Sequence, residues 1–271
     1  MKKLLLIFFI LDYACCTNAQ TSTDTALIEK NVPKADDPSE FFTRIEVFNE
    51  LQYHEAEDLF YNKTILRTIV KIGKRFTTRL DLPVIYNSST SDENYKQSGL
   101  GDISFRLLGF KFLENPKSAL AASIEISMNT AQSPNLGTGK NMLIPMVSYT
   151  KRFPKEKMLL AMLLQQVISV GGDEARSDIS YSKLELIVLK AWSGRFWTVL
   201  APEWYFDYIN GGTSMNLRTR LTYAPTPRLN IWTTPSAGIF GDFITRYQWS
   251  AEIGCRYYLF KEMNFKKKPG E

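Results

Sequence analysis

The chain has 271 residues, of which 44% are hydrophobic and 13% aromatic, and its formal net charge is +5 at pH 7. The basic residues are spread along the chain rather than gathered in a patch, which argues against nucleic-acid binding. Beyond the amino terminus no apolar run approaches the roughly eighteen residues that a helical membrane span needs. Three cysteines and one histidine do not suggest a disulfide framework or a metal site, and we expect no cofactor.

The first residues have the pattern of a secretory signal peptide. Lys2 and Lys3 give a positive start, residues 4–11 form an apolar run, and a small-residue cleavage site ends at Ala19. This pattern predicts a signal peptide over residues 1–19. A lipoprotein is the alternative because two cysteines lie in this segment, but neither has the aliphatic residue that a lipobox carries three positions earlier.

Three segments follow the signal peptide. Residues 20–40 are polar and have no regular period, so we expect a flexible periplasmic lead, with a small plug inside the lumen as the alternative. Residues 41–260 carry a strand pattern, and we expect a transmembrane barrel there. Residues 261–271 contain three consecutive lysines and are expected to form a basic periplasmic tail.

The barrel prediction comes from a two-residue period in polarity. Over residues 75–86 the apolar Leu80 and Val84 alternate with Arg79 and Asp81, and pleating sends alternate side chains to opposite faces. An arginine on the lipid side would cost roughly 2–4 kcal/mol near the bilayer midplane, so the charged face is expected to point inward. The same alternation recurs in residues 119–128 and 215–223.

The lengths of the connections give an independent indication. Short turns are expected at residues 73–74, 114–117, 154–157, 193–195 and 225–227. Longer polar segments alternate with them, at residues 54–62, 87–99, 129–141, 171–180, 208–214 and 240–246. Outer-membrane barrels have short periplasmic turns, longer external loops and an even number of strands. The sequence therefore predicts an all-β fold, a twelve-stranded antiparallel up-and-down transmembrane β-barrel.

The last predicted strand carries a pattern of its own. Glu252, Gly254, Tyr257 and Leu259 resemble the C-terminal signal by which the barrel-assembly machinery recognises its substrates. This resemblance implies localisation in the outer membrane of a Gram-negative bacterium. The expected partners are outer-membrane lipid and that machinery.

Three short motifs resemble a known family. They are residues 79–84 (RLDLPV), residues 99–104 (GLGDIS) and residues 223–227 (YAPTP). Together they resemble the outer-membrane barrel family of transporters named for the meta-pathway of phenol degradation. The resemblance implies a porin-like barrel and uptake of a solute, but it does not imply that the solute is phenol.

The predicted inner face is of mixed charge. Trp232 is the candidate for contact with a solute, because its position in the two-residue period of the strand places its side chain on the inner face. No faces are assigned to residues 144–151 and 158–170, which are too uniformly apolar. The full set of lumen-lining candidates is Arg44, Glu46, Arg75, Arg79, Asp81, Asp102, Arg106, Glu125, Arg218, Arg220, Trp232, Glu252 and Arg256.

Two functions fit this wall. The first is a narrow channel or transporter for a small hydrophobic or anionic solute, selected by rings of charge. The second is a closed structural or surface-interaction barrel whose interior is held by salt bridges. An enzyme is not expected, because His54 is the only histidine and no serine lies near it in the sequence.

Overall fold

The computed structural model describes residues 35–92, 94–241 and 247–259 of the chain. The predicted signal peptide (residues 1–19), most of the predicted lead (residues 20–34) and the predicted basic tail (residues 261–271) lie outside these ranges. Within the described ranges, no helix is long and apolar enough to cross a membrane.

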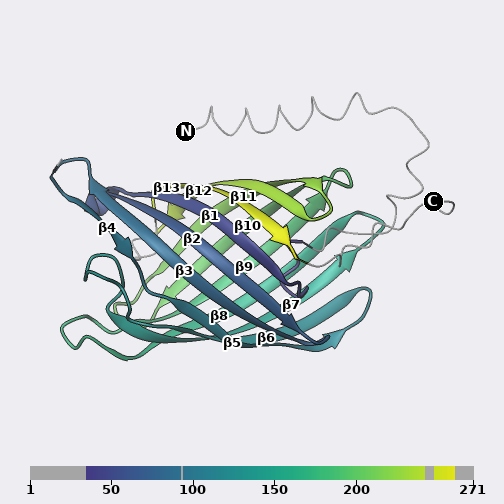
Figure 1. The fold of residues 1–271 in the computed structure, drawn as a ribbon, viewed down its shortest axis with the longest axis horizontal. Helices are drawn as coiled ribbons and strands as arrows, with labels where there is room; N and C mark the ends of the chain where they lie inside the picture. The colour runs from purple at the N-terminus through teal and green to yellow at the C-terminus, as the bar shows by residue number, and fades with distance from the viewer. Residues whose placement is uncertain (1–34, 93, 242–246, 260–271) are drawn as a thin grey trace. The chain divides into compact units, whose positions relative to one another are not determined.

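The described residues form one antiparallel sheet of thirteen strands that closes into a barrel (Figure 1). Neighbours along the chain pair with one another, and β1 closes the wall against β13 from Arg44–Tyr258 to Tyr53–Trp249. The strands are β1 (Arg44–His54), β2 (Leu59–Ile72), β3 (Phe76–Ser89), β4 (Lys96–Leu100), β5 (Ser104–Glu114), β6 (Ser118–Ser127), β7 (Lys140–Phe153), β8 (Met158–Gly172), β9 (Ser180–Ala191), β10 (Phe196–Asp207), β11 (Thr213–Thr226), β12 (Leu229–Phe240) and β13 (Trp249–Tyr258). A single-turn 3-10 helix, Glu55–Glu57, follows β1.

Two of the thirteen strands share one position in the wall. Both β4 and β5 pair with β3, β4 opposite residues 84–88 and β5 opposite residues 76–81. They are two halves of one strand that is interrupted at residues 101–103. The wall therefore has twelve strand positions, and the predicted twelve-stranded antiparallel barrel is confirmed.

The two faces of the wall differ as the two-residue period predicts. On β3, Leu80 and Val84 are 36% and 50% exposed, whereas Asp81 between them is 6% exposed. Aromatic side chains that are exposed or half-buried lie near both ends of the outer face. Tyr53, Phe60 and Trp249 form one group, with centroids 4.9 to 6.2 Å apart, and Phe76, Phe110 and Phe112 form another, at 4.6 and 5.0 Å. Such aromatic girdles mark the two membrane interfaces of outer-membrane barrels.

The short connections lie at the same end of the barrel as the starts of β1 and β3, and we call it the periplasmic end. Several details differ from the sequence prediction. The first long connection, predicted over residues 54–62, is limited to residues 55–58, because β2 begins at Leu59. β11 continues through Thr226, so the turn before β12 consists of Pro227 and Arg228. Tyr247 lies two residues before Trp249, so the two-residue period predicts that both face outward, but Tyr247 is buried and precedes the first residue of β13.

The final strand divides the predicted assembly signal between its two faces. Glu252 is buried on the inner side, whereas Tyr257 and Leu259 are 45% and 41% exposed on the outer side. Gly254 lies between Trp232 and Phe48, where an added Cβ would overlap the indole ring and come within 2.6 Å of the Phe48 Cβ. Only a residue without a side chain fits this part of the wall. Recognition by the assembly machinery remains a prediction.

Replacing Gly254 with alanine is expected to destabilise the folded barrel. Overpacking of this kind typically costs about 1–3 kcal/mol, because Trp232 or Phe48 must move. The free energy of urea unfolding, measured on refolded protein in micelles, reports this cost apart from any effect on cellular assembly. Gly194→Ala is the control, since nothing lies within 4 Å of a Cβ there, and equal losses in both variants would contradict the packing argument.

Candidate functional site

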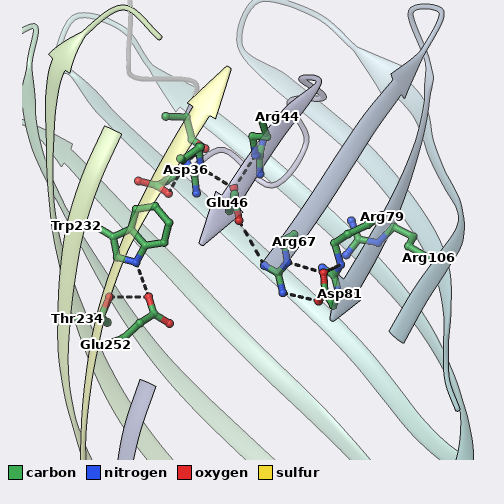
Figure 2. Close-up of polar contacts among 12 residues, drawn as sticks. Asp36, Arg44, Glu46, Arg67, Arg79, Asp81, Arg106, Trp232, Thr234 and Glu252 are labelled. Atoms are coloured by element: carbon green, nitrogen blue, oxygen red, sulfur yellow. Dashed lines mark hydrogen bonds and ion pairs between the residues drawn. The ribbon is translucent and has the colours of Figure 1, made fainter. Parts of the chain in front are cut away.

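The inner face of the barrel carries a chain of paired charges, and part of it is drawn in Figure 2. Arg67 of β2 donates two hydrogen bonds to Asp81 of β3, at 2.8 and 2.7 Å. Its Nη1 also lies 3.6 Å from Glu46 of β1. Glu46 in turn accepts hydrogen bonds from Arg44 and Arg256, both at 2.6 Å. Each carboxylate thus joins cations from neighbouring strands.

The chain continues past β3 to β6. Arg79 Nε lies 3.4 Å from Asp81 Oδ1, and its Nη2 donates to Glu125 of β6. Arg106 of β5 stands opposite Arg79 in the ladder, and its Nη2 lies 3.7 Å from the same Glu125 oxygen. Two arginines therefore share one carboxylate at this point of the wall.

In the other direction the chain runs from β13 to β9. Glu252 accepts from Arg218 at 3.1 Å and from Arg220 at 3.0 Å, both on β11. Arg218 also donates to Glu203 of β10 at 3.3 Å, and Lys183 of β9 donates to Glu203 at 2.7 Å. The pairs between wall residues therefore pass around most of the barrel. In the described part of the chain, the buried charged residues of β7 pair instead with residues outside the strands, Arg152 with Asp37 and Glu40 and Lys140 with Asp178.

Trp232 belongs to this chain rather than to an open surface. It is 5% exposed, and its indole Nε1 donates to Glu252 Oε1 at 2.5 Å. The guanidiniums of Arg220 and Arg256 each lie 5.2 Å from the centroid of the ring, within the range of cation–π contacts. Phe48 packs beside it at 6.3 Å. The indole therefore fixes two arginines of the wall.

Residues 35–42, which precede β1, enter the barrel and contact these arginines. Asp36 accepts hydrogen bonds from Arg220 and Arg256, both at 3.2 Å, from Trp197 Nε1 at 2.6 Å and from Thr222 Oγ1 at 3.3 Å. Burial alone would raise the pKa of Asp36. The charges of Arg256 and Arg220 outweigh it and lower the pKa from 3.8 to about 2.

A second set of contacts holds the same segment to β7 and β5. Arg152 donates to Asp37 at 2.7 Å, to Ser39 Oγ at 2.9 Å and to Glu40 at 3.1 Å. Lys111 Nζ lies 3.8 Å from the other oxygen of Glu40. Asp37, Ser39 and Arg152 are all buried. Three carboxylates of the segment are thus matched by four wall cations.

Apolar contacts complete the docking of residues 35–42. Phe42 packs edge-on against Tyr258 with ring centroids 5.5 Å apart. Ala35 and Phe42 join a buried cluster built from the inner faces of β8 to β11 and from β13. Its wall members are Leu159, Ala161, Ile187, Leu189, Ala191, Trp197, Val199, Ala201, Ala224 and Tyr258.

At the opposite, external end, the segment between β6 and β7 (residues 128–139) bonds to β3 and to the break in the β4–β5 strand. Asp102 accepts hydrogen bonds from the backbone N–H and the hydroxyl of Thr138, at 2.7 and 2.9 Å. Asn87 donates to the Asn135 carbonyl oxygen at 2.8 Å. Asp102 therefore anchors an external loop.

Most of the predicted lumen candidates lie on the inner face, in the chain described above. Two do not: Arg75 is exposed in the turn between β2 and β3, and Asp102 holds the external loop. Arg75 was assigned by extending the strand period one residue too far. The sequence does not single out Lys111, Arg152 and Trp197 of the wall. Lys111 and Arg152 lie in segments without a clear period, and a tryptophan such as Trp197 is expected in the interfacial girdles.

Asp36 is expected to make stability depend on pH. Its pKa is lower in the folded state than the usual 3.8, so the contribution is complete above about pH 4 and is lost as pH falls towards 2. This lowering of the pKa corresponds to a contribution of about 2 kcal/mol to the free energy of unfolding. Asp36→Asn should remove this contribution at pH 6. The difference between the unfolding free energies of the variant and wild type should shrink below pH 4, as measured by urea unfolding. Asp92→Asn, in an exposed loop, is the control, and a pH-independent difference for Asp36→Asn would argue against the assignment.

By sequence, no protein-family model and no curated protein matches the chain. By structure it resembles an outer membrane channel from Pseudomonas putida F1, with a TM-score of 0.66 and 12% identity over 88% of this chain and 99% of the channel. It also resembles the porin NanC (TM-score 0.56, 10% identity, 79% of this chain and 100% of NanC) and the porin KdgM (0.54, 8%, 80% and 99%). At such identities the likeness establishes the fold. Together with the apolar outer face, the girdles and the charged interior, it makes the chain an outer-membrane β-barrel.

Proposed function

We propose that the protein is a narrow channel for a small solute, and that residues 35–42 close its periplasmic end. The observation that carries the proposal is the ionic docking of this segment: three of its carboxylates pair with wall cations of four different strands. Ionic contacts of this kind can exchange with a solute or with salt, whereas a structural plug needs no such pairing. A twelve-stranded wall encloses less space than the sixteen strands of open porins, which favours a small solute.

A closed structural barrel is the second candidate. It is favoured by the chain of ion pairs, which ties neighbouring strands together, and by the apolar cluster around Ala35 and Phe42. In that function the external loops would carry the interaction with a partner. The two functions differ in a measurable way, because only the first requires flux through the lumen.

Membership of the transporter family named for the meta-pathway of phenol degradation is part of the proposal. Its three motifs lie at an ion-paired stretch of the wall, at a break in a strand and at the end of a strand. Residues 79–84 lie in β3 and include two members of the ion-pair chain, residues 99–104 span the break between β4 and β5, and residues 223–227 end β11. The positions support a shared architecture, and the solute is left to experiment.

Weakening the docked segment should open the channel. Arg152→Gln removes the cation that holds Asp37, Ser39 and Glu40, so its conductance in planar bilayers should exceed that of wild type several-fold. Arg75→Gln is the matched control, since Arg75 is exposed at the same end of the barrel. Absence of channel events in wild type and in Arg152→Gln alike would defeat the transport proposal and favour the closed barrel.

Reversing the charge of two wall arginines is a second test that distinguishes the channel from the closed barrel. Arg218→Glu with Arg220→Glu places two new carboxylates beside Glu203 and Glu252. In an open pore, the reversal potential under a salt gradient should shift towards cation selectivity. In a sealed barrel, only the unfolding free energy should fall. Arg195→Glu, in an exposed turn, should leave both quantities unchanged.

A further inference from the structure

We propose that the wall site that holds Asp36 is a receptor for the carboxylate of a small organic anion with an apolar body. In this proposal, which rests on the proposed channel function, Asp36 occupies the receptor as a tethered ligand until such an anion displaces it. The inference names both the class of solute and the event that opens the periplasmic end.

The receptor belongs entirely to the wall. The four groups that donate to Asp36 come from three strands: Trp197 from β10, Arg220 and Thr222 from β11, and Arg256 from β13. The segment contributes the Asp36 carboxylate, whose side chain is 5% exposed, and the Ala35 carbonyl oxygen, which accepts from Arg256 Nη1 at 2.6 Å. Two guanidiniums, an indole N–H and a hydroxyl converging on one carboxylate make a binding site for an anion, since charge-assisted hydrogen bonds are the strong ones.

The donors are also held in place by the wall itself. Arg220 donates to Glu252 at 3.0 Å and to Thr234 at 3.2 Å, and Arg256 donates to Glu46 at 2.6 Å. These contacts involve no residue of the docked segment, so both guanidiniums keep their orientation when it leaves. A site organised in advance loses little free energy on ordering when it binds a ligand.

The neighbourhood of the receptor selects an apolar body. Ala35, next to Asp36, is 3% exposed in the cluster that includes Trp197, Leu159 and Leu189. Burial of apolar surface contributes roughly 25 cal/mol per Å². A solute with a short hydrocarbon chain would regain the contacts that Ala35 gives up, which acetate or chloride cannot do.

Competition sets the concentration that a free anion needs. A ligand tethered by a short flexible linker acts at an effective concentration on the order of millimolar. A free carboxylate of similar intrinsic affinity must therefore be supplied at roughly tens of millimolar to displace Asp36. This range is accessible with hexanoate, which carries a carboxylate on a five-carbon chain.

Release of the segment can be followed through a buried thiol in the full-length chain. Ala35→Cys, with the native cysteines replaced by serine, keeps every polar contact of the segment and places the thiol where Ala35 is 3% exposed. A charged maleimide should react slowly with this cysteine in folded protein. We expect hexanoate to raise the reaction rate several-fold, while hexanol and sodium chloride at the same concentration change it little.

Two further variants test whether the carboxylate receptor is responsible. Arg220→Gln removes one guanidinium, so basal labelling should rise and the response to hexanoate should disappear. Arg195→Gln, exposed in a turn, should keep both the slow basal rate and the response. Folding of each variant is checked by its urea midpoint, so that loss of the barrel is not mistaken for loss of the site.

The opposite results would overturn the inference. Equal acceleration by hexanoate and hexanol would mean that apolar solvation alone loosens the segment, and equal acceleration by chloride would mean charge screening alone. No response to hexanoate would also refute it. Labelling requires no flux, so a barrel that conducts but ignores hexanoate loses only this inference. A barrel that responds but never conducts keeps the receptor and loses the proposed channel.

Discussion

The hydrocarbon of the membrane decides the direction of the charged side chains in the central part of this wall. A strand gives its residues only two directions, and a charge on the lipid side would cost several kilocalories per mole. Arg79 and Asp81 on β3, and Arg218 and Arg220 on β11, are therefore all turned inward, where each has a partner of opposite charge. The same constraint places Leu80 and Val84 outside.

Turning the charges inward creates a second requirement. A buried ion without a partner is strongly destabilising, since its desolvation is not repaid. Most wall cations pair with a carboxylate on a neighbouring strand. The two carboxylates that contact Arg152 are those of Asp37 and Glu40, which belong to the docked segment. The wall therefore has a local excess of positive charge that residues 35–42 neutralise. This explains why a polar segment without a strand pattern is ordered inside the barrel.

The same physics determines what could be predicted from the sequence. The alternation of β3, β6 and β11 is visible because most of their inner residues are charged or polar and most of their outer residues are apolar. β8 lacks it, since Leu159 and Ala161 on its inner face belong to the apolar cluster beneath the docked segment, so both of its faces are apolar. The contacts of Asp36 and Asp37 join residues more than a hundred positions apart, and nothing local in residues 35–42 indicates them.

The pairing of the wall also bears on how such a lumen can select a solute. Where each cation already has a carboxylate, as between Arg67 and Asp81, the pair presents little net field to a passing ion. Two pairs of arginines share a carboxylate: Arg79 and Arg106 share Glu125, and Arg220 and Arg256, which also bond to Glu252 and Glu46 of the wall, share Asp36. Only the second pair depends on a residue outside the wall. Departure of Asp36 would therefore change the charge of the lumen at the moment of opening, and an anion is the solute whose entry that change favours.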